Sequence, residues 1–523
     1  MTKYIFTTGG VVSGIGKGIV AASIGNLLTR YNYSVSILKC DPYLNIDPGT
    51  MNPQQHGEVF VTRDGAETDL DLGHYERFIN TPLSKLNSIS TGTIYNSILN
   101  KERRGEYKGG TVQIFHVVEE IKNRIRLIST QQSPDFLIIE IGGTVGDMES
   151  IPFLEAVRQI QSEEDNEDVC CVHLVYIPYL SNVGEHKTKP AQHSVRSLRE
   201  TGITPDIIIT RAETSLEYSI LEKVSKYCYT DVSNVIDCPN VSSLYQVPQV
   251  LEKNNIIKCL RTKLNFKRSV VDPEWNTLVS SLSKPKLHNV HIAMVGKYSN
   301  LKDSYISITE ALIHASLPSN VNLSIEYIKP SSLSQYNIKA FDGVVIPGGF
   351  GSKGTEQILF WVAQCRQLNI PTLGICLGMQ LMCIEFARNV LNLEEANSTE
   401  FDEYTDHPIF YILPEKDLIN IGGTLRKGFY PTRIKHNTNV FNIYNKEIIY
   451  ERHRHRFEFN NFYRGQFIDN DFSIVGTSPD KSLVEVVQLS NHPFYIGTQY
   501  HPEFESSLVD PHPLFISFLT SCI

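Results

Sequence analysis

The chain has 523 residues, of which 41% are hydrophobic and 20% are charged. This length predicts two to four domains, and this composition excludes a largely disordered protein. The formal net charge of −9 argues against nucleic acid as the main partner, because duplex-binding surfaces are usually basic. Nucleotides remain candidate ligands, since they need only local clusters of cations.

The ten cysteines are scattered and form no Cys-x-x-Cys pair. We therefore expect neither a disulfide framework nor a structural zinc site, which is typical of a reducing compartment. The sequence shows no leader-like start, and no apolar run approaches the roughly 18 residues that a membrane span needs. These features predict a cytoplasmic protein with no membrane segment.

Apolar runs alternate with segments of helical spacing along the first half of the chain. The expected strands are 4–8, 35–39, 136–141, 172–177 and 206–210, and helices are expected at 18–29 and 116–128. Such alternation is typical of a parallel sheet with helices on both faces. We predict a doubly wound α/β domain at residues 1–267.

The alternation lapses where Lys, Ser and Pro dominate, and then it restarts. We place a linker at 268–288, with a short helix around 272–283, before a second doubly wound α/β domain at 289–523. Its expected strands are 291–295, 323–328, 343–346, 371–375 and 494–498.

A glycine-rich turn at 9–18 follows the first expected strand and precedes a helix. Backbone N–H groups at such a helix N-terminus bind phosphate, and Lys17 would add a positive charge. Gly18 stands where a standard P-loop has the Ser or Thr that binds magnesium. We therefore expect carboxylates to hold the metal, with Asp71 and Glu140 as candidates. The alternative is a solvated loop acid at Asp71 and a buried acid with a protein partner at Glu140.

Two further groups of cations are candidates for phosphate binding. Lys187 and Lys189 lie in a loop at 184–192 and could bind a second triphosphate, although a solvated charged turn is the simpler interpretation. Lys39 ends the second expected strand beside Asp41, and its alternative is an ordinary exposed lysine.

Cys376 lies between an apolar strand and a helix, in a turn flanked by Gly374 and Gly378. This arrangement is a nucleophile elbow with Cys in place of Ser, and the helix N-terminus favours the thiolate. The alternative is a buried structural cysteine. His501 would act as the base and Glu503 would orient it. The glycine-rich turn at 347–351, with the N–H of residue 377, could form an oxyanion hole.

These motifs carry a resemblance to known families. The segments 374–378 and 500–504 resemble the class I glutamine amidotransferases, which release ammonia from glutamine through a thioester. The segments 9–18, 39–43, 55–60, 68–78, 142–150 and 187–192 are together similar to the CTP synthases. The resemblance runs through nearly the whole chain.

The resemblance implies roles for matching positions. The catalytic triad would be Cys376, His501 and Glu503, and Mg²⁺ would lie on Asp71 and Glu140. ATP would bind Ser13, Gly14, Ile15, Gly16, Lys17, Gly18, Lys39, Asp71, Pro239, Asn240 and Val241. UTP or CTP would bind Ser13, Asp147, Met148, Glu149, Lys187, Thr188, Lys189, Pro190, Ala191, Gln192 and Lys223. Glutamine would bind Gly349, Leu377, Gly378, Met379, Gln380, Glu400 and Arg456.

Two departures from the family pattern bear on nucleotide affinity, because Met148 and Ala191 replace the more usual Ile and Thr. Arg456 lies in the charged run 451–458, which by composition predicts a charged strand face or a weak basic patch.

The resemblance implies that ATP phosphorylates O4 of UTP, that ammonia from glutamine displaces the phosphate, and that CTP results. It also implies feedback inhibition by CTP, activation by GTP, and assembly into homotetramers and sometimes filaments. Two other functions stay open: a different amidotransferase–synthetase, and a non-catalytic filament-forming scaffold.

Overall fold

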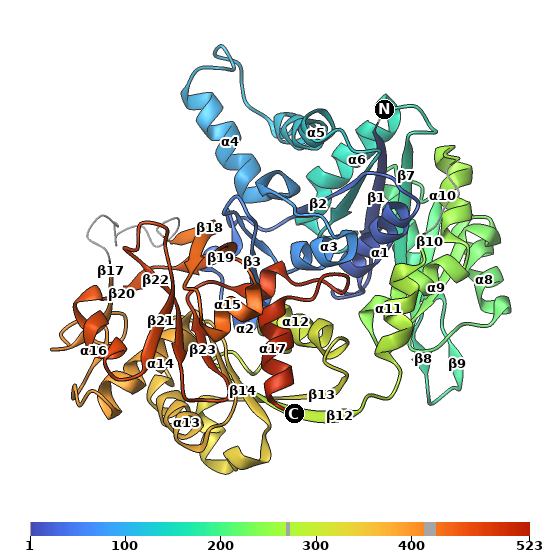
Figure 1. The fold of residues 1–523 in the computed structure, drawn as a ribbon. Helices are drawn as coiled ribbons and strands as arrows, with labels where there is room; N and C mark the ends of the chain where they lie inside the picture. Colours follow the sequence, from blue (N-terminus) through green and yellow to red (C-terminus); the bar gives the residue numbers. More distant parts are fainter. Residues whose placement is uncertain (1, 268–271, 413–424) are drawn as a thin grey trace. The chain divides into compact units, whose positions relative to one another are not determined.

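The computed structural model describes residues 2–267, 272–412 and 425–523 (Figure 1). Residues 268–271 of the predicted linker lie outside the described residues. Internal contacts divide the chain into a first unit, Met1–Asp47 with Asp71–Val279, and a second unit, Pro48–Leu70 with Ser280–Ile523. The segment 48–70 therefore clusters with the C-terminal half, although its sequence neighbours lie in the first unit. The domain boundaries at 267 and 289 stay a prediction.

The first unit is built on a parallel sheet of seven strands in the order β11-β10-β7-β1-β6-β2-β5. The strands are β1 (Lys3–Gly9), β2 (Val35–Asp41), β5 (Ser88–Ser90), β6 (Phe136–Ile141), β7 (Val169–Tyr176), β10 (Ile207–Ala212) and β11 (Val235–Pro239). The five strands expected here from the sequence are confirmed. The sheet-forming segments are short apolar runs because a parallel sheet is buried on both faces.

Helices cover both faces of this sheet. On one face, α4 (Thr91–Arg103), α5 (Ile114–Gln131) and α6 (Ile151–Glu163) share a core with Phe6 and Leu137. On the other, Gly25 of α1 (Lys17–Arg30) lies against Ile37 and Ile138. The remaining helices are α3 (Asp71–Ile79), α7 (Lys189–Glu200), α8 (Tyr218–Cys228), α9 (Val247–Lys253), α10 (Ile256–Leu264) and α11 (Glu274–Leu282). The doubly wound architecture predicted for this half is confirmed, as is the short helix near 272–283 (Figure 1).

The second unit contains a sheet of nine strands in the order β13-β12-β14-β15-β23-β22-β21-β18-β19. Its first five strands in this order are parallel: β13 (Val321–Ile328), β12 (His288–Val295), β14 (Gly343–Ile346), β15 (Thr372–Ile375) and β23 (Tyr495–Thr498). The other four are antiparallel to their neighbours: β22 (Val484–Leu489), β21 (Phe472–Thr477), β18 (Arg426–Ile434) and β19 (Ile448–His455). The sequence predicted only the parallel part. The connection from β22 to β23 is too short for a crossover, so these two strands must be antiparallel.

The second unit also has α2 (Pro53–His56), α12 (Ile306–Ser316), α13 (Thr355–Leu368), α14 (Leu377–Asn389), α15 (Asn439–Tyr444), α16 (Arg464–Ile468) and α17 (Pro513–Ser521). The hairpin of β3 (Val59–Val61) and β4 (Glu67–Asp69) belongs to this unit. Among the described helices, none has the length and apolar character needed to cross a membrane.

The charged run 451–458 is not a basic surface patch. It supplies residues 451–455 of β19 and the first two residues of β20 (Phe457–Phe459), and Glu451, Arg452 and His453 are at most 2% exposed. Arg452 Nε donates to Glu505 Oε1 at 2.5 Å, so this buried arginine has a carboxylate partner. Arg454 likewise pairs with Glu67 in the same unit. Composition alone does not reveal these partners, so it does not distinguish a buried charged strand from a surface patch.

Candidate active sites

The glycine-rich turn lies between β1 and α1, at the carboxyl end of the parallel sheet, where α/β proteins bind ligands. Gly14 and Gly16 have φ of +71° and +95°, values that glycine adopts without strain. Lys17 begins α1, is buried, and donates from Nζ to the carbonyl of Gly143. Burial lowers the pKa of Lys17, against the carboxylates of Glu140 and Asp71, which raise it.

Arg211, at the end of β10, connects this turn to the predicted adenine-side residues. Its Nε donates to the carbonyl of Ile15 at 3.2 Å, and its Nη atoms donate to the carbonyl of Pro239 and to Oδ1 of Asn240, both at 3.0 Å. Arg211 was not among the residues predicted from the sequence. A charged residue at the carboxyl end of an apolar strand was the available signal.

A buried ion cluster lies beside Lys17. Lys39 Nζ contacts Asp71 Oδ2, and it donates to Glu140 Oε1 at 3.0 Å. Burial lowers the pKa of Lys39, but Asp71, Glu140 and Asp41 outweigh it and hold the pKa well above its usual value. The hydroxyl of Tyr75, a residue not predicted from the sequence, donates to Glu140 Oε2. Lys39 is thus a buried charge, and the interpretation as an ordinary exposed lysine is wrong.

Gly18 lies directly against the two carboxylates that were predicted to hold a metal. A Cβ at this position would be 2.2 Å from Asp71 Oδ1 and 3.4 Å from Glu140 Oε2. The carboxylates therefore take the space where a standard P-loop carries its hydroxyl side chain. Their oxygens are ligands that Mg²⁺ prefers, so the donor set fits that ion. Within the described residues, no group of three or more His, Cys, Asp or Glu could hold a metal, so further ligands would come from phosphate or water.

The predicted UTP and CTP positions lie in several segments of the first unit. The loop predicted at 184–192 ends at Thr188, because α7 begins at Lys189, and Lys223 lies in α8. Asp147 Oδ2 accepts from the backbone N–H of Thr144 at 2.9 Å, and Met148 is 81% exposed. Lys187 pairs with Glu185, next to the start of α7. Thr188 and Ala191 are buried, Pro190 is half-buried, and Lys189 and Lys223 are exposed. Gln192 Nε2 donates to Thr188 Oγ1 at 3.0 Å.

In the second unit, Cys376 lies between β15 and α14 with φ of +52° and ψ of −103°. This is a strained conformation for a non-glycine residue, as expected of a nucleophile elbow. A Cβ on Gly378 would be 2.1 Å from the carbonyl oxygen of Ile346, and one on Gly374 would be 2.3 Å from Met382 Sδ. The flanking glycines are therefore required by close packing.

His501 and Glu503 form a buried pair, with His501 Nδ1 2.7 Å from Glu503 Oε1. Burial lowers the pKa of His501, but Glu503 and Cys376 outweigh it and raise the pKa to about 10. His501 Nε2 has no hydrogen-bond partner among the described residues. A Cβ on Gly348 would be 2.9 Å from His501 Cε1 and 3.6 Å from Cys376 Cβ, so both side chains border the same small space.

A pocket beside Cys376 contains Gly349 and Arg454, together with Tyr298. Glu400 Oε1 accepts from the backbone N–H of Gly351 at 2.6 Å. Lys297 Nζ contacts the carbonyl of Gly351, and burial lowers its pKa to about 8. Sequence reasoning missed Lys297, Tyr298 and Arg454, since nothing in their local pattern differs from ordinary loop and strand residues. Among the other predicted glutamine-binding residues, Leu377, Met379 and Gln380 are buried in α14, and Arg456 follows β19.

An elbow cysteine with a buried His–Glu pair is the arrangement expected of a glutamine amidotransferase unit, and a glycine-rich turn beside a buried ion cluster is the arrangement expected of an ATP-dependent synthetase unit. The family model of the CTP synthase N-terminus matches residues 3–266, and that of class I glutamine amidotransferases matches residues 300–521. The chain belongs to the CTP synthase family.

Individual relatives are similar along the whole length. A CTP synthase of Gloeothece citriformis is 49% identical, with 100% of this chain and 95% of the relative covered. A CTP synthase of Cyanothece sp. is 51% identical, with 99% and 96% covered. Among solved structures, the glutaminase domain of Trypanosoma brucei CTPS with bound acivicin is 32% identical, covering 45% of this chain and 93% of that chain, with a TM-score of 0.42.

Proposed function

We propose that this chain converts UTP to CTP with ATP, and that glutamine hydrolysis at Cys376 supplies the ammonia. Membership of the CTP synthase family gives the overall reaction of a carbon–nitrogen ligase that uses glutamine. The observation that carries the division of labour is the presence, in separate units, of an elbow cysteine with a buried His–Glu pair and of a phosphate-binding turn with two carboxylates.

At the glutaminase site, Cys376 Sγ attacks the side-chain carbonyl carbon of glutamine after giving its proton to His501. Glu503 holds the imidazolium that forms, which the raised pKa of His501, about 10, supports. His501 returns the proton to the leaving ammonia, and water then hydrolyses the thioester. The backbone N–H groups of Gly349 and Leu377 are the proposed oxyanion donors.

At the synthetase site, the chain positions ATP and UTP for phosphoryl transfer and neutralises their charge. The turn at 13–18 would bind ATP phosphates, with Lys17 and Lys39 as the cations. Asp71 and Glu140 would hold Mg²⁺, which when bound offsets phosphate charge. The turn of Pro239, Asn240 and Val241 would border adenine, and residues 187–192 with Lys223 would bind UTP.

Regulation and assembly extend the proposal. CTP would share the triphosphate contacts of UTP and would be distinguished at Asp147, Met148 and Glu149. Activation by GTP, a homotetramer, filaments and a cytoplasmic location stay predictions, for which family membership is the support.

One assay tests the function: the purified chain is given UTP, ATP and Mg²⁺, with glutamine or ammonium chloride as nitrogen donor, and CTP is measured by chromatography. We expect CTP with both donors. If no CTP forms with either donor, the proposal is wrong and the filament-forming scaffold is favoured. If only another acceptor is aminated, a different amidotransferase–synthetase is favoured.

A further inference from the structure

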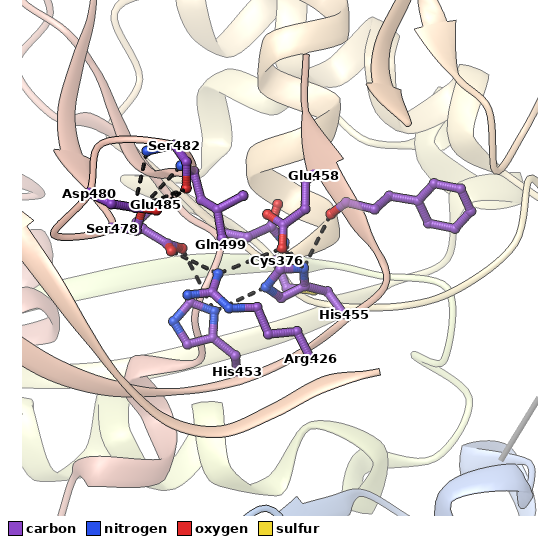
Figure 2. A network of polar contacts seen from close by, with 12 residues as sticks. Cys376, Arg426, His453, His455, Glu458, Ser478, Asp480, Ser482, Glu485 and Gln499 are labelled. Atoms are coloured by element: carbon purple, nitrogen blue, oxygen red, sulfur yellow. Dashed lines mark hydrogen bonds and ion pairs between the residues drawn. The ribbon is translucent and has the colours of Figure 1, made fainter. Parts of the chain in front are cut away.

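Gln499 lies between β23 and His501 and is completely buried. Its Nε2 donates to Cys376 Sγ at 3.7 Å, and its Oε1 accepts from Gln380 Nε2 at 3.4 Å. Figure 2 labels Gln499 and Cys376 within one connected set of polar contacts. None of the roles described above uses this carboxamide, although it touches the sulfur that reacts.

We propose that Gln499 is a further catalytic residue of the glutaminase site, whose carboxamide N–H stabilises the Cys376 thiolate. The inference rests on the proposed function of Cys376 as nucleophile. A hydrogen bond to a charged acceptor is stronger than one to a neutral acceptor, so the donor favours the thiolate over the thiol.

The orientation of the carboxamide follows from chemistry at both of its ends. With Nε2 toward sulfur, Gln499 donates to the thiolate while Gln380 donates to Oε1. The reverse orientation would place a carbonyl oxygen against the thiolate, and the two partial negative charges would repel. The backbone carbonyl of Arg454 also lies 3.8 Å from Cys376 Sγ, so the Gln499 N–H is the group that offsets this acceptor when the sulfur is charged.

Two backbone hydrogen bonds fix the position of Gln499 and of the residue before it. The N–H of Gln499 donates to the carbonyl of Glu485 at 2.8 Å, and the N–H of Cys376 donates to the carbonyl of the preceding residue, Thr498, at 2.6 Å. Glu485 is itself fully buried and pairs with Arg426 at 2.7 Å (Figure 2). Because both backbone anchors are in the sheet core, the donor is already in position before glutamine binds, as electrostatic catalysis requires.

The donor acts twice in one turnover. In the first step the C–S bond forms, the C–N bond breaks, and ammonia leaves with the proton that His501 took from Cys376. In the second, His501 takes a proton from water as the water oxygen adds to the thioester, the C–S bond breaks, and sulfur leaves as the thiolate that Gln499 stabilises. The sum is glutamine plus water giving glutamate plus ammonia, with no change of oxidation state.

The test uses Gln499→Met, which keeps the length of the side chain and removes the donor, in the full-length protein. The rate at which iodoacetamide alkylates Cys376 is followed by peptide mass spectrometry across pH, since only the thiolate reacts. The expected result is a profile displaced to higher pH, and a fall in the kcat for glutamine of about 10- to 100-fold with little change in KM. CTP formation from ammonium chloride should stay at the wild-type level.

A matched control is Gln488→Met, which alters another buried glutamine on the neighbouring strand β22. It should leave the alkylation profile unchanged. Gln499→Glu keeps the shape of the side chain and puts a carboxylate beside sulfur, so it should displace the profile further than Gln499→Met and carries the test if the latter does not fold.

An alkylation profile in both Gln499 variants that matches wild type would overturn the proposal, even if glutamine turnover falls, because Gln499 would then be a structural residue only. Failure of the underlying function has a different signature: Cys376→Ala would keep its glutamine-dependent activity.

Discussion

The contact between Gly18 and the two carboxylates predicts a large effect from a single added methyl group. In Gly18→Ala, the new Cβ would be 2.2 Å from Asp71 Oδ1, whereas ordinary contact begins at 3.4 Å. Asp71 cannot move alone, because Lys39 links it to Glu140 in the same buried cluster. The methyl group must therefore displace the whole set of charges beside Lys17.

The magnitude follows from the size of this displacement. A shift of about 1 Å at a reacting centre can cost roughly 100-fold in rate. Overpacking of this kind costs about 1–3 kcal/mol of stability, which a large two-domain chain tolerates. We expect Gly18→Ala to fold and to lose about two orders of magnitude of CTP formation with ammonium chloride or glutamine.

The assay compares two activities in one preparation: CTP formation from ammonium chloride, and hydrolysis of glutamine without nucleotides. The second should stay at the wild-type level in Gly18→Ala, because Cys376 belongs to the other unit. Gly465→Ala is the matched control, since a Cβ there meets nothing within 4 Å, and it should preserve both activities. A folded Gly18→Ala variant with CTP formation within a few-fold of wild type would refute the reasoning.

Other predictions concern single side chains. Cys376→Ala should abolish glutamine-dependent synthesis, by several orders of magnitude, while synthesis from ammonium chloride persists and rises with pH; loss of both in a folded variant would contradict separable sites. Glu140→Ala should abolish CTP formation with either donor, and near-normal turnover would remove Glu140 from the site. Glu149→Ala should weaken inhibition by CTP more than it raises the apparent UTP requirement, and equal shifts in initial-rate measurements would mean that the pyrimidine pockets coincide. The pKa of His501 is raised from 6.5 to about 10, so its stabilising contribution is complete below pH 6.5 and is lost as pH rises through 10. In Glu503→Gln, the urea unfolding midpoint should fall less steeply as the pH rises through 10. An unchanged dependence of the midpoint on pH would exclude Glu503 as the cause.

The sequence predicted the elements that repeat a simple pattern. The strands at 4–8 and 136–141 are apolar runs, and the structure has β1 and β6 there. The elbow at Cys376 was predicted from its flanking glycines, and its strained φ of +52° agrees. The antiparallel part of the second sheet was not predicted. Its strands do not share one apolar pattern, since β19 is a charged segment, and strand direction depends on the connections between strands.

Partners distant in sequence were the harder part of the site. Tyr75 is an ordinary apolar residue of α3 by spacing, and only the fold places its hydroxyl on Glu140. Arg211 contacts Ile15 across 196 residues, and Lys297 contacts the carbonyl of Gly351 across 54. Local patterns carry no information about such pairs, so the sequence predicted reactive groups and missed the groups that hold them.

Two glycines, Gly18 and Gly348, connect the local sequence pattern with contacts between residues that are distant in the chain. Gly18 and Gly348 do not have the positive φ that would make glycine necessary for the backbone, unlike Gly14 and Gly16. Each is instead required by what lies against its Cα: the carboxylates of Asp71 and Glu140 at Gly18, and the imidazole of His501 at Gly348. In both units the missing side chain makes room for the groups to which we assign the chemistry. A glycine next to a reactive residue in such a sequence therefore predicts a close approach of functional groups, and the approaching group must be sought far along the chain.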